Sequence, residues 1–235
     1  DPAHRRGSFL RLRLPAAESV IPMDSLLSSL VAGLLLINLV ALGTSRIGTV
    51  VRAIALQGVL LGILAVAAHG EVSNRVVALA VASMLLKGWL IPLILFRALR
   101  QVAIKREVEP SLGLLPSLLL GALATVLSVA AASRLPLAET RLAPLLVPAS
   151  FATVAAGFIL ITTRRKAISQ VLGFLQLENG IFIFGLLLVE AMPFLVEVGV
   201  LLDLFVGIFV LSIIIHHINR EFASQDTRRL SLLKE

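Results

Sequence analysis

Three ionisable residues stand inside long apolar runs. They are Lys87 in ASMLLKGWLIPLIL, Glu178 in VLGFLQLENGIFIFGL and Asp203 in VEVGVLLDLFVGIFVL. Each lies about ten residues from the start of its run, which is roughly 16 Å along a helix and close to the middle of a hydrocarbon layer about 30 Å thick. A charge at that depth is costly unless it faces protein or water, so such residues indicate ion or proton pathways.

The unequal number of acids and bases favours a proton relay over a purely structural ion pair. One cation cannot neutralise two carboxylates, and removal from water favours the neutral form of both kinds of group. We therefore expect at least one carboxyl to exchange its proton at neutral pH and all three residues to line one polar path. We expect Glu178→Gln to impair coupling between redox turnover and ion movement without loss of stability or assembly. The alternative is that Lys87 simply ties two helices together through Glu178 or Asp203.

Other polar residues are predicted to have smaller roles. Asn38 suits a hydrogen bond between helices, and two histidines at a membrane boundary suit interfacial anchoring. Glycines spaced like Gly58 and Gly62 indicate close helix packing. The minor relay or access candidates are Gln57, Glu190, Glu197, His216 and His217.

The composition predicts the elements that must position these residues. The chain has 235 residues, of which 58% are hydrophobic and 15% charged, whereas soluble domains have about 25% charged residues. That balance excludes a soluble domain and a disordered chain, and the unbroken apolar blocks differ from the alternating pattern of a membrane barrel. The sequence therefore predicts an all-α polytopic membrane protein.

The remaining composition limits the chemistry of the chain. Cysteine is absent, so the chain can form no disulfide, thiolate iron–sulfur site or cysteine-liganded zinc site. His216 and His217 are adjacent, and neighbouring side chains on a helix point about 100° apart, which does not suit a metal clamp. The basic residues fall between apolar blocks, which predicts no nucleic-acid partner. We expect neither catalysis nor a metal or cofactor in this chain.

Hydropathy predicts about seven transmembrane helices, since each needs roughly 20 apolar residues. Residues 1–22 form a basic N-terminal extension that we expect not to be native, 23–142 a four-helix membrane part, 143–219 a three-helix part, and 220–235 a cytoplasmic tail. The expected helices cover residues 24–43, 48–69, 76–97, 112–133, 143–163, 167–189 and 193–216.

Basic residues predict the orientation. With seven spans, the loops after the first, third and fifth helices and the C-terminal tail share one side. That side holds 13 Lys and Arg residues, against 7 on the other side. Because basic loops stay in the cytoplasm, we expect the N-terminus outside and the C-terminus in the cytoplasm of a bacterial or archaeal cell.

The last third of the sequence resembles subunit K of respiratory complex I. The matching features are a basic loop (TTRRK), the segment VLGFLQLENGIFIFGL and a helix with a central acid (LLDLFVGIFVLSIIIHH). The family's buried glutamate of the middle helix corresponds to Glu178, and that of the last helix to Asp203, where Asp shortens the side chain. The Leu-Glu-Asn-Gly motif, preceded by four helices, is most similar to the hydrogenase-4 component E family.

That resemblance implies a non-catalytic membrane subunit of a group 4 NiFe hydrogenase or formate-hydrogenlyase-type complex. The expected partners are antiporter-like subunits, a quinone-site-type membrane subunit, and peripheral NiFe hydrogenase and iron–sulfur subunits, which would carry the NiFe centre and the clusters. The alternative is the equivalent subunit of a multi-subunit cation/proton antiporter or another complex I-like respiratory complex. A free-standing transporter would need matched broken helices, and only Pro92 predicts one.

Overall fold

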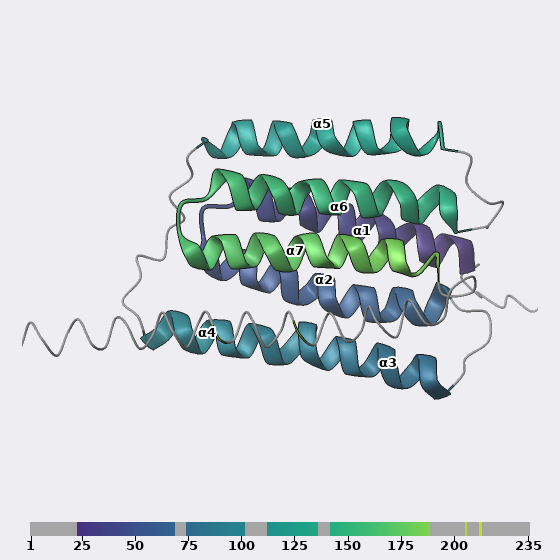
Figure 1. The fold of residues 1–235 in the computed structure, drawn as a ribbon, viewed down its shortest axis with the longest axis horizontal. Coiled ribbons are helices and arrows are strands. Elements are labelled where there is room, and N and C mark those ends of the chain that lie inside the picture. The colour runs from purple at the N-terminus through teal and green to yellow at the C-terminus, as the bar shows by residue number, and fades with distance from the viewer. Residues whose placement is uncertain are drawn as a thin grey trace, which may run out of the picture.

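The computed structural model describes residues 23–68, 74–101, 112–135 and 142–188, together with Phe205 and Ser212, and this part of the chain is all-helical. The helices are α1 (Met23–Gly43), α2 (Ile47–Ala68), α3 (Asn74–Leu85), η1 (Leu86–Leu90), α4 (Ile91–Gln101), α5 (Leu114–Ala132), α6 (Ala143–Thr163) and α7 (Ala167–Gly185). Because α3, η1 and α4 follow one another without a break, they form one helical rod (Figure 1).

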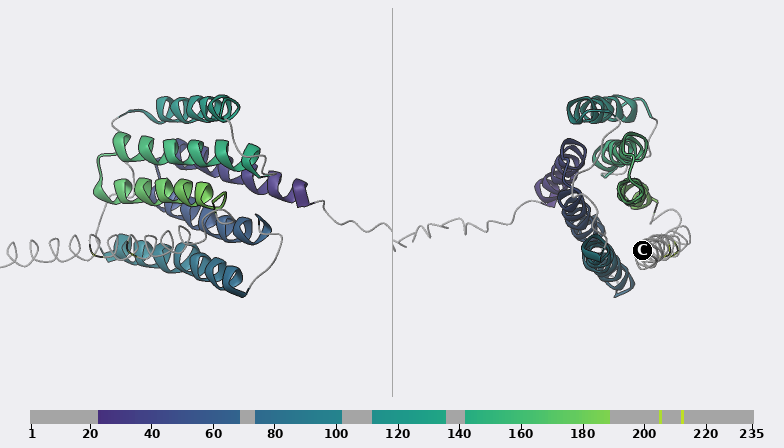
Figure 2. Two further views of the ribbon diagram at one scale, coloured as in Figure 1. Left: turned by 45° about the vertical axis from the view of Figure 1, so that its right-hand side comes forward. Right: turned by 90° about the vertical axis from the view of Figure 1, so that its left-hand side faces the viewer.

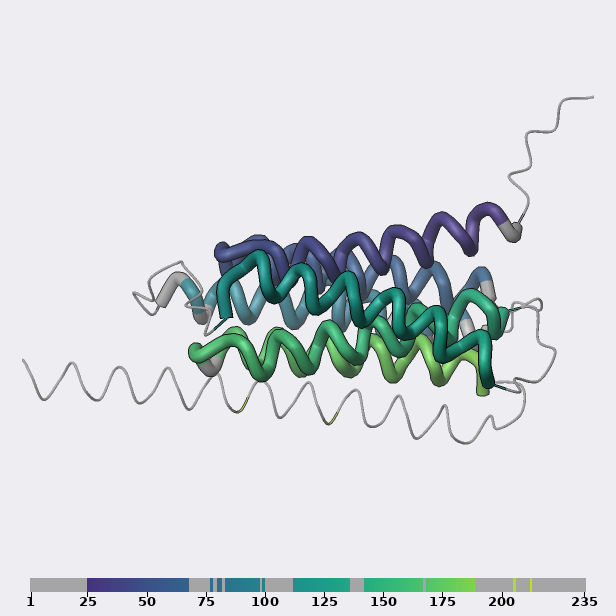
Figure 3. The backbone as a smooth tube through the Cα atoms, turned by 90° about the horizontal axis from the view of Figure 1, so that it is seen from above, coloured from purple at the N-terminus to yellow at the C-terminus, as the bar shows by residue number. Residues whose placement is uncertain are grey.

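The rods lie side by side in two layers. α1, α2 and the α3–η1–α4 rod form one layer, α6 and α7 the other, and α5 packs at one edge against α1 and α6 (Figures 2 and 3). Within the described ranges, four helices (α1, α2, α5 and α6) are long and apolar enough to cross a membrane. The chain is therefore a multi-pass membrane protein.

The expected helices agree with the observed ones to within a few residues at most ends. The third helix differs most, because it begins at Asn74 and continues to Gln101, four residues beyond the expected Arg97. Long arginine side chains near a helix end can extend toward the membrane surface, so Arg97 does not end the helix. The sixth expected helix ends earlier, at Gly185, and is followed by a turn. The expected seventh helix at 193–216 and both terminal segments lie outside the described residues.

The π-helical segment η1 interrupts the third rod at its centre. Pro92 lacks an N–H group, and its ring would collide with the carbonyl of Gly88 four residues earlier in a regular α-helix. The Ile91 N–H instead donates to Leu86 O, five residues earlier. Such π segments occur often at functional sites, and this one contains Lys87.

Glycines allow close helix contacts on both sides of the bundle. A Cβ atom on Gly58 of α2 would lie 2.8 Å from Lys87 Cβ, and one on Gly62 would lie 2.9 Å from Met84 Cε. The packing role predicted for this glycine pair is thus confirmed. Between α6 and α7, a Cβ on Gly157 would lie 2.5 Å from Leu177 N. These glycine contacts bring α2 against α3 and η1, and α6 against α7.

Basic residues of the described chain gather at one end of the bundle. This end contains the connections from α1 to α2 and from α6 to α7 and the end of α4 (Figure 1), with Arg46, Arg97, Arg100, Arg164, Arg165 and Lys166. The opposite end of the described chain has Arg75 and Arg134. The two ends of the described bundle therefore differ in their number of basic residues.

Candidate proton-relay site

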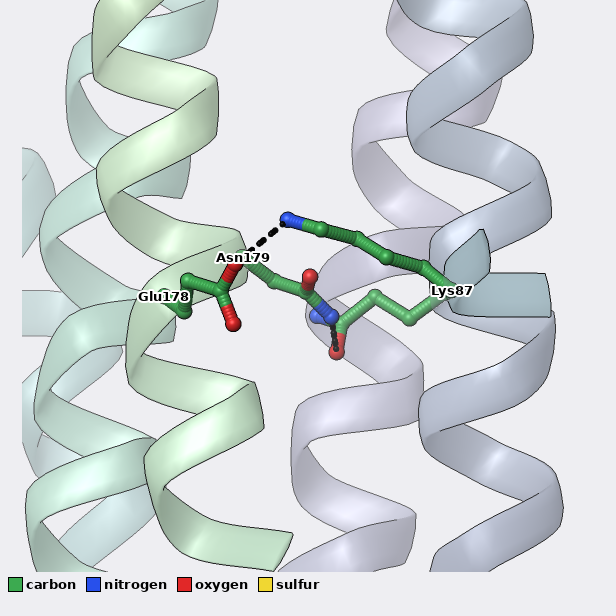
Figure 4. A network of polar contacts seen from close by, with 4 residues as sticks. Lys87, Glu178 and Asn179 are labelled. Atoms are coloured by element: carbon green, nitrogen blue, oxygen red, sulfur yellow. Dashed lines mark hydrogen bonds and ion pairs between the residues drawn. The ribbon is translucent and has the colours of Figure 1, made fainter. Parts of the chain in front are cut away.

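Lys87 and Glu178 form an ion pair between the two layers. Lys87 Nζ lies 3.1 Å from Glu178 Oε1, and the two side chains are 5% and 7% exposed. Lys87 is at the centre of the α3–η1–α4 rod and Glu178 is in the middle of α7, and the side chains extend toward each other across the gap between the helices (Figure 4). Two of the three residues expected on one polar path are therefore brought together.

An aromatic ring and a glycine contact the Lys87 side chain. Lys87 Nζ lies 5.1 Å from the centre of the Phe182 ring, one helical turn after Glu178 in α7. An aromatic face attracts a cation, most strongly where water is excluded. Gly58 packs against the aliphatic part of Lys87. Because glycine has no side chain, α2 leaves room for the lysine at this position.

A layer of neutral polar side chains lies beside the ion pair. We call Asn38, Gln57, Thr153, Gln176 and Asn179 the polar layer. They come from α1, α2, α6 and α7, and each is at most 2% exposed. The polar layer connects α7 to α2 next to Glu178, because Asn179 Nδ2 donates to Gln57 Oε1 at 3.3 Å. Figure 4 shows Asn179 beside the pair.

One residue of the polar layer was predicted as a minor relay or access residue. The other four were not predicted to belong to the site. Gln57 was expected as a minor relay residue and lies in the layer, bonded to Asn38 and Asn179. Asn38 was expected to bond another helix, which is confirmed by its contact with Thr153. Gln176 and Asn179 flank Glu178 in the QLEN run, and that run of polar residues within an apolar helix was the available signal.

Asp203, the second expected relay carboxylate, lies outside the described residues, and so do Glu190, Glu197, His216 and His217. Within the described ranges, no three His, Cys, Asp or Glu side chains gather in a way that could hold a metal ion. The described site places a carboxyl group 3.1 Å from an amine, a separation across which a proton can move.

Arg164 is a buried cation at the basic end of the bundle. It is 2% exposed and donates from Nη2 to Leu42 O at 2.8 Å. Leu42 lies in the last turn of α1, where carbonyl groups lack partners within the helix and a cation is favoured by the helix dipole. Burial lowers the pKa of the Arg164 guanidinium. Because an arginine pKa ordinarily lies above 12, Arg164 stays charged at neutral pH.

We predict that Arg164→Met lowers the free energy of unfolding by about 1 to 3 kcal/mol, because Leu42 O loses a hydrogen bond to a charged donor. The effect should be the same at every pH between about 5 and 9, since the arginine charge does not change there. The measurement is unfolding in mixed micelles by a denaturing detergent. Arg165→Met, at the exposed neighbouring position, is the matched control and should change stability by less than about 0.5 kcal/mol. An equal loss of stability in both variants would contradict a stabilising role for the Arg164–Leu42 hydrogen bond.

Comparison with known proteins gives one informative match. No protein-family model matches the sequence, and no solved structure matches it. The chain is similar to a protein of Mycobacterium tuberculosis (strain ATCC 25618 / H37Rv) named "Uncharacterized protein Rv0085". The two are 30% identical over 205 residues, which cover 86% of this chain and 93% of the relative. A match of that extent includes the helices that carry the ion pair, and the chain belongs to the same family as the Mycobacterium tuberculosis protein Rv0085.

Proposed function

We propose that this chain is a non-catalytic membrane subunit of a group 4 NiFe hydrogenase complex, in which it relays protons through the Lys87–Glu178 pair. The observation that carries the proposal is the pair itself, with its two side chains 5% and 7% exposed and 3.1 Å apart at the middle of two helices. Its support is chemical, because a buried ionisable pair in a membrane span is the kind of group that a proton pathway uses.

The pair suits a relay because two of its states carry no net charge. With the proton on Lys87 the groups are an ammonium and a carboxylate, and with the proton on Glu178 they are an amine and a carboxylic acid. Both are compatible with a low dielectric, whereas an additional proton gives a net charge of +1, which is costly to bury. A proton that arrives from one side is therefore held briefly and passed on. In the complete subunit, Asp203 would be the next carboxylate on this path.

The number of helices favours the hydrogenase proposal over its antiporter alternative. In the antiporter case the resemblance to subunit K would account for α6, α7 and one further helix, whereas α1, α2, the α3–η1–α4 rod and α5 precede them here. A free-standing transporter is less well supported, because it would need matched broken helices, and η1 is the only such interruption among the described helices. In the proposed complex the C-terminus lies in the cytoplasm, and the NiFe centre and iron–sulfur clusters belong to partner subunits.

Purification of the tagged chain from native membranes tests the proposal. We expect an NiFe hydrogenase subunit, iron–sulfur subunits and antiporter-like membrane subunits to co-purify in constant ratio, with nickel and iron in the same fractions. Recovery with antiporter subunits and without nickel would favour the alternative. Recovery of the chain alone, after mild extraction that leaves other membrane complexes intact, would contradict both.

A further inference from the structure

Asn38 connects both helix layers through one carboxamide. Its Nδ2 donates to Thr153 Oγ1 of α6 at 2.9 Å. Its Oδ1 accepts from Gln57 Nε2 of α2 at 2.9 Å and from Gln176 Nε2 of α7 at 2.6 Å. Asn38 is 2% exposed, so these three contacts replace water as its hydrogen-bond partners. One residue of α1 thus holds three other helices.

The hydroxyl of Thr153 determines how every amide in the polar layer is oriented. It donates its single proton to Ala149 O at 2.7 Å, so toward Asn38 it can act only as an acceptor. Asn38 must therefore present its NH₂ group to Thr153 and its oxygen to the other two helices. Gln57 and Gln176 must then donate to that oxygen, which turns the oxygen of Gln57 toward the NH₂ group of Asn179. A single assignment of donors and acceptors accounts for these four hydrogen bonds between side chains.

This series fixes the rotation of α7 at the position of Glu178. Gln176 precedes Glu178 by two residues and Asn179 follows it, so at 100° per residue they leave the helix on faces other than that of Glu178. Gln176 is bonded to α1 and Asn179 to α2. Rotation of α7 away from Lys87 would break both bonds at buried side chains, where an unpaired amide is costly.

We propose that Asn38 is a positioning residue that holds Glu178 opposite Lys87. Its functional meaning rests on the proposed relay, but the position of Glu178 can be measured without transport. An amide neither takes up nor releases a proton at neutral pH, so the polar layer orients the pair and does not itself carry protons. Gln57, which the sequence predicts as a minor relay or access residue, takes part in the same orienting series.

Carbodiimide cross-linking of the full chain in membranes tests this proposal. A lipid-soluble carbodiimide activates the Glu178 carboxyl group, and an amine within reach then forms an amide with release of the urea. Mass spectrometry of the linked peptides gives the yield of the Lys87–Glu178 product. For Asn38→Ala we expect the yield to fall roughly fivefold or more, because the hydrogen bonds that fix α7 are lost.

Two further variants separate positioning from a general loss of stability. Asn38→Asp is expected to restore the yield, since burial favours the protonated carboxyl group, which presents one donor and one acceptor at the same places. Arg164→Met also removes a bond from α1, but at the membrane surface, and should leave the yield unchanged although it destabilises the chain.

Each outcome decides for or against the positioning role. A folded Asn38→Ala chain that cross-links with the wild-type yield would overturn it, as would an Asn38→Asp yield no better than that of Asn38→Ala. If Asn38→Ala does not fold, Thr153→Val removes only one partner of Asn38 and keeps the side-chain shape, and a wild-type yield there would overturn it as well. A result against the relay role would be distinct from these outcomes, because it would appear as normal ion translocation in variants that lack the Lys87–Glu178 pair.

Discussion

In the Glu178→Gln variant we expect proton translocation by the proposed complex to fall to the background rate. We also expect the chain to lose about 3 to 5 kcal/mol of stability, because removal of one partner leaves Lys87 buried and uncompensated. The translocation measurement uses sealed vesicles with redox turnover followed in parallel. The stability measurement is unfolding of the isolated chain in mixed micelles. The ion pair predicts the loss of stability, and the relay interpretation predicts the loss of translocation.

The expected loss of stability differs from what the sequence suggested. Considered alone, a buried carboxylate is a cost, so its replacement by a neutral amide should preserve stability. The ion pair between Lys87 and Glu178, at 3.1 Å, reverses the sign of the expected change in stability. In the folded chain the carboxylate compensates the charge of Lys87, and an amide cannot.

A double variant separates the relay from a purely structural role. Lys87→Met with Glu178→Met removes both charges and keeps similar side-chain volumes, and such replacements of buried ion pairs are often neutral or stabilising. We expect stability and subunit content close to those of the wild type, with translocation still absent. If the double variant translocates protons at the normal ratio to redox turnover, the pair only ties α7 to the third rod and the relay interpretation fails.

The second large effect is expected at the contact between α6 and α7. A Cβ atom on Gly157 would lie 2.5 Å from Leu177 N, and one on Gly180 would lie 2.6 Å from Val154 N. Both neighbours are backbone atoms, so the helices must separate to admit any side chain. We predict that Gly157→Val lowers the free energy of unfolding by about 3 kcal/mol or more. Separation would also draw Thr153 away from Asn38 and reduce the yield of the Lys87–Glu178 cross-link.

Gly185 provides the matched control for this contact. It lies at the end of α7, and a Cβ atom there meets nothing within 4 Å. Gly185→Val introduces the same side chain and should therefore change stability by less than about 1 kcal/mol. Unfolding in mixed micelles compares the two variants directly. Equal losses of stability at both positions would mean that valine disturbs the helices themselves and not their contact.

Much of the helical framework was predictable because hydrocarbon leaves the backbone few choices. In a bilayer, every N–H and C=O group must be bonded within the chain, so a run of about 20 apolar residues becomes a helix. This is why α1, α2, α5 and α6 lie close to their expected boundaries. The same hydropathy profile marked Lys87 and Glu178 as buried, since a charge in the middle of such a run has no route to water. These inferences need only composition along the chain.

The tertiary structure decided which residues meet. Hydropathy does not record helix rotation or neighbours, so it could not tell whether Lys87 faces Glu178 or another acid, and the geometry shows Glu178 at 3.1 Å. The π-helical segment at Lys87 was marked only by Pro92. The central place of Asn38 depends on side chains 19, 115 and 138 residues away in sequence. A single buried carboxamide acquires a role only when packing brings its partners within about 3 Å, because hydrogen bonds act over that distance alone.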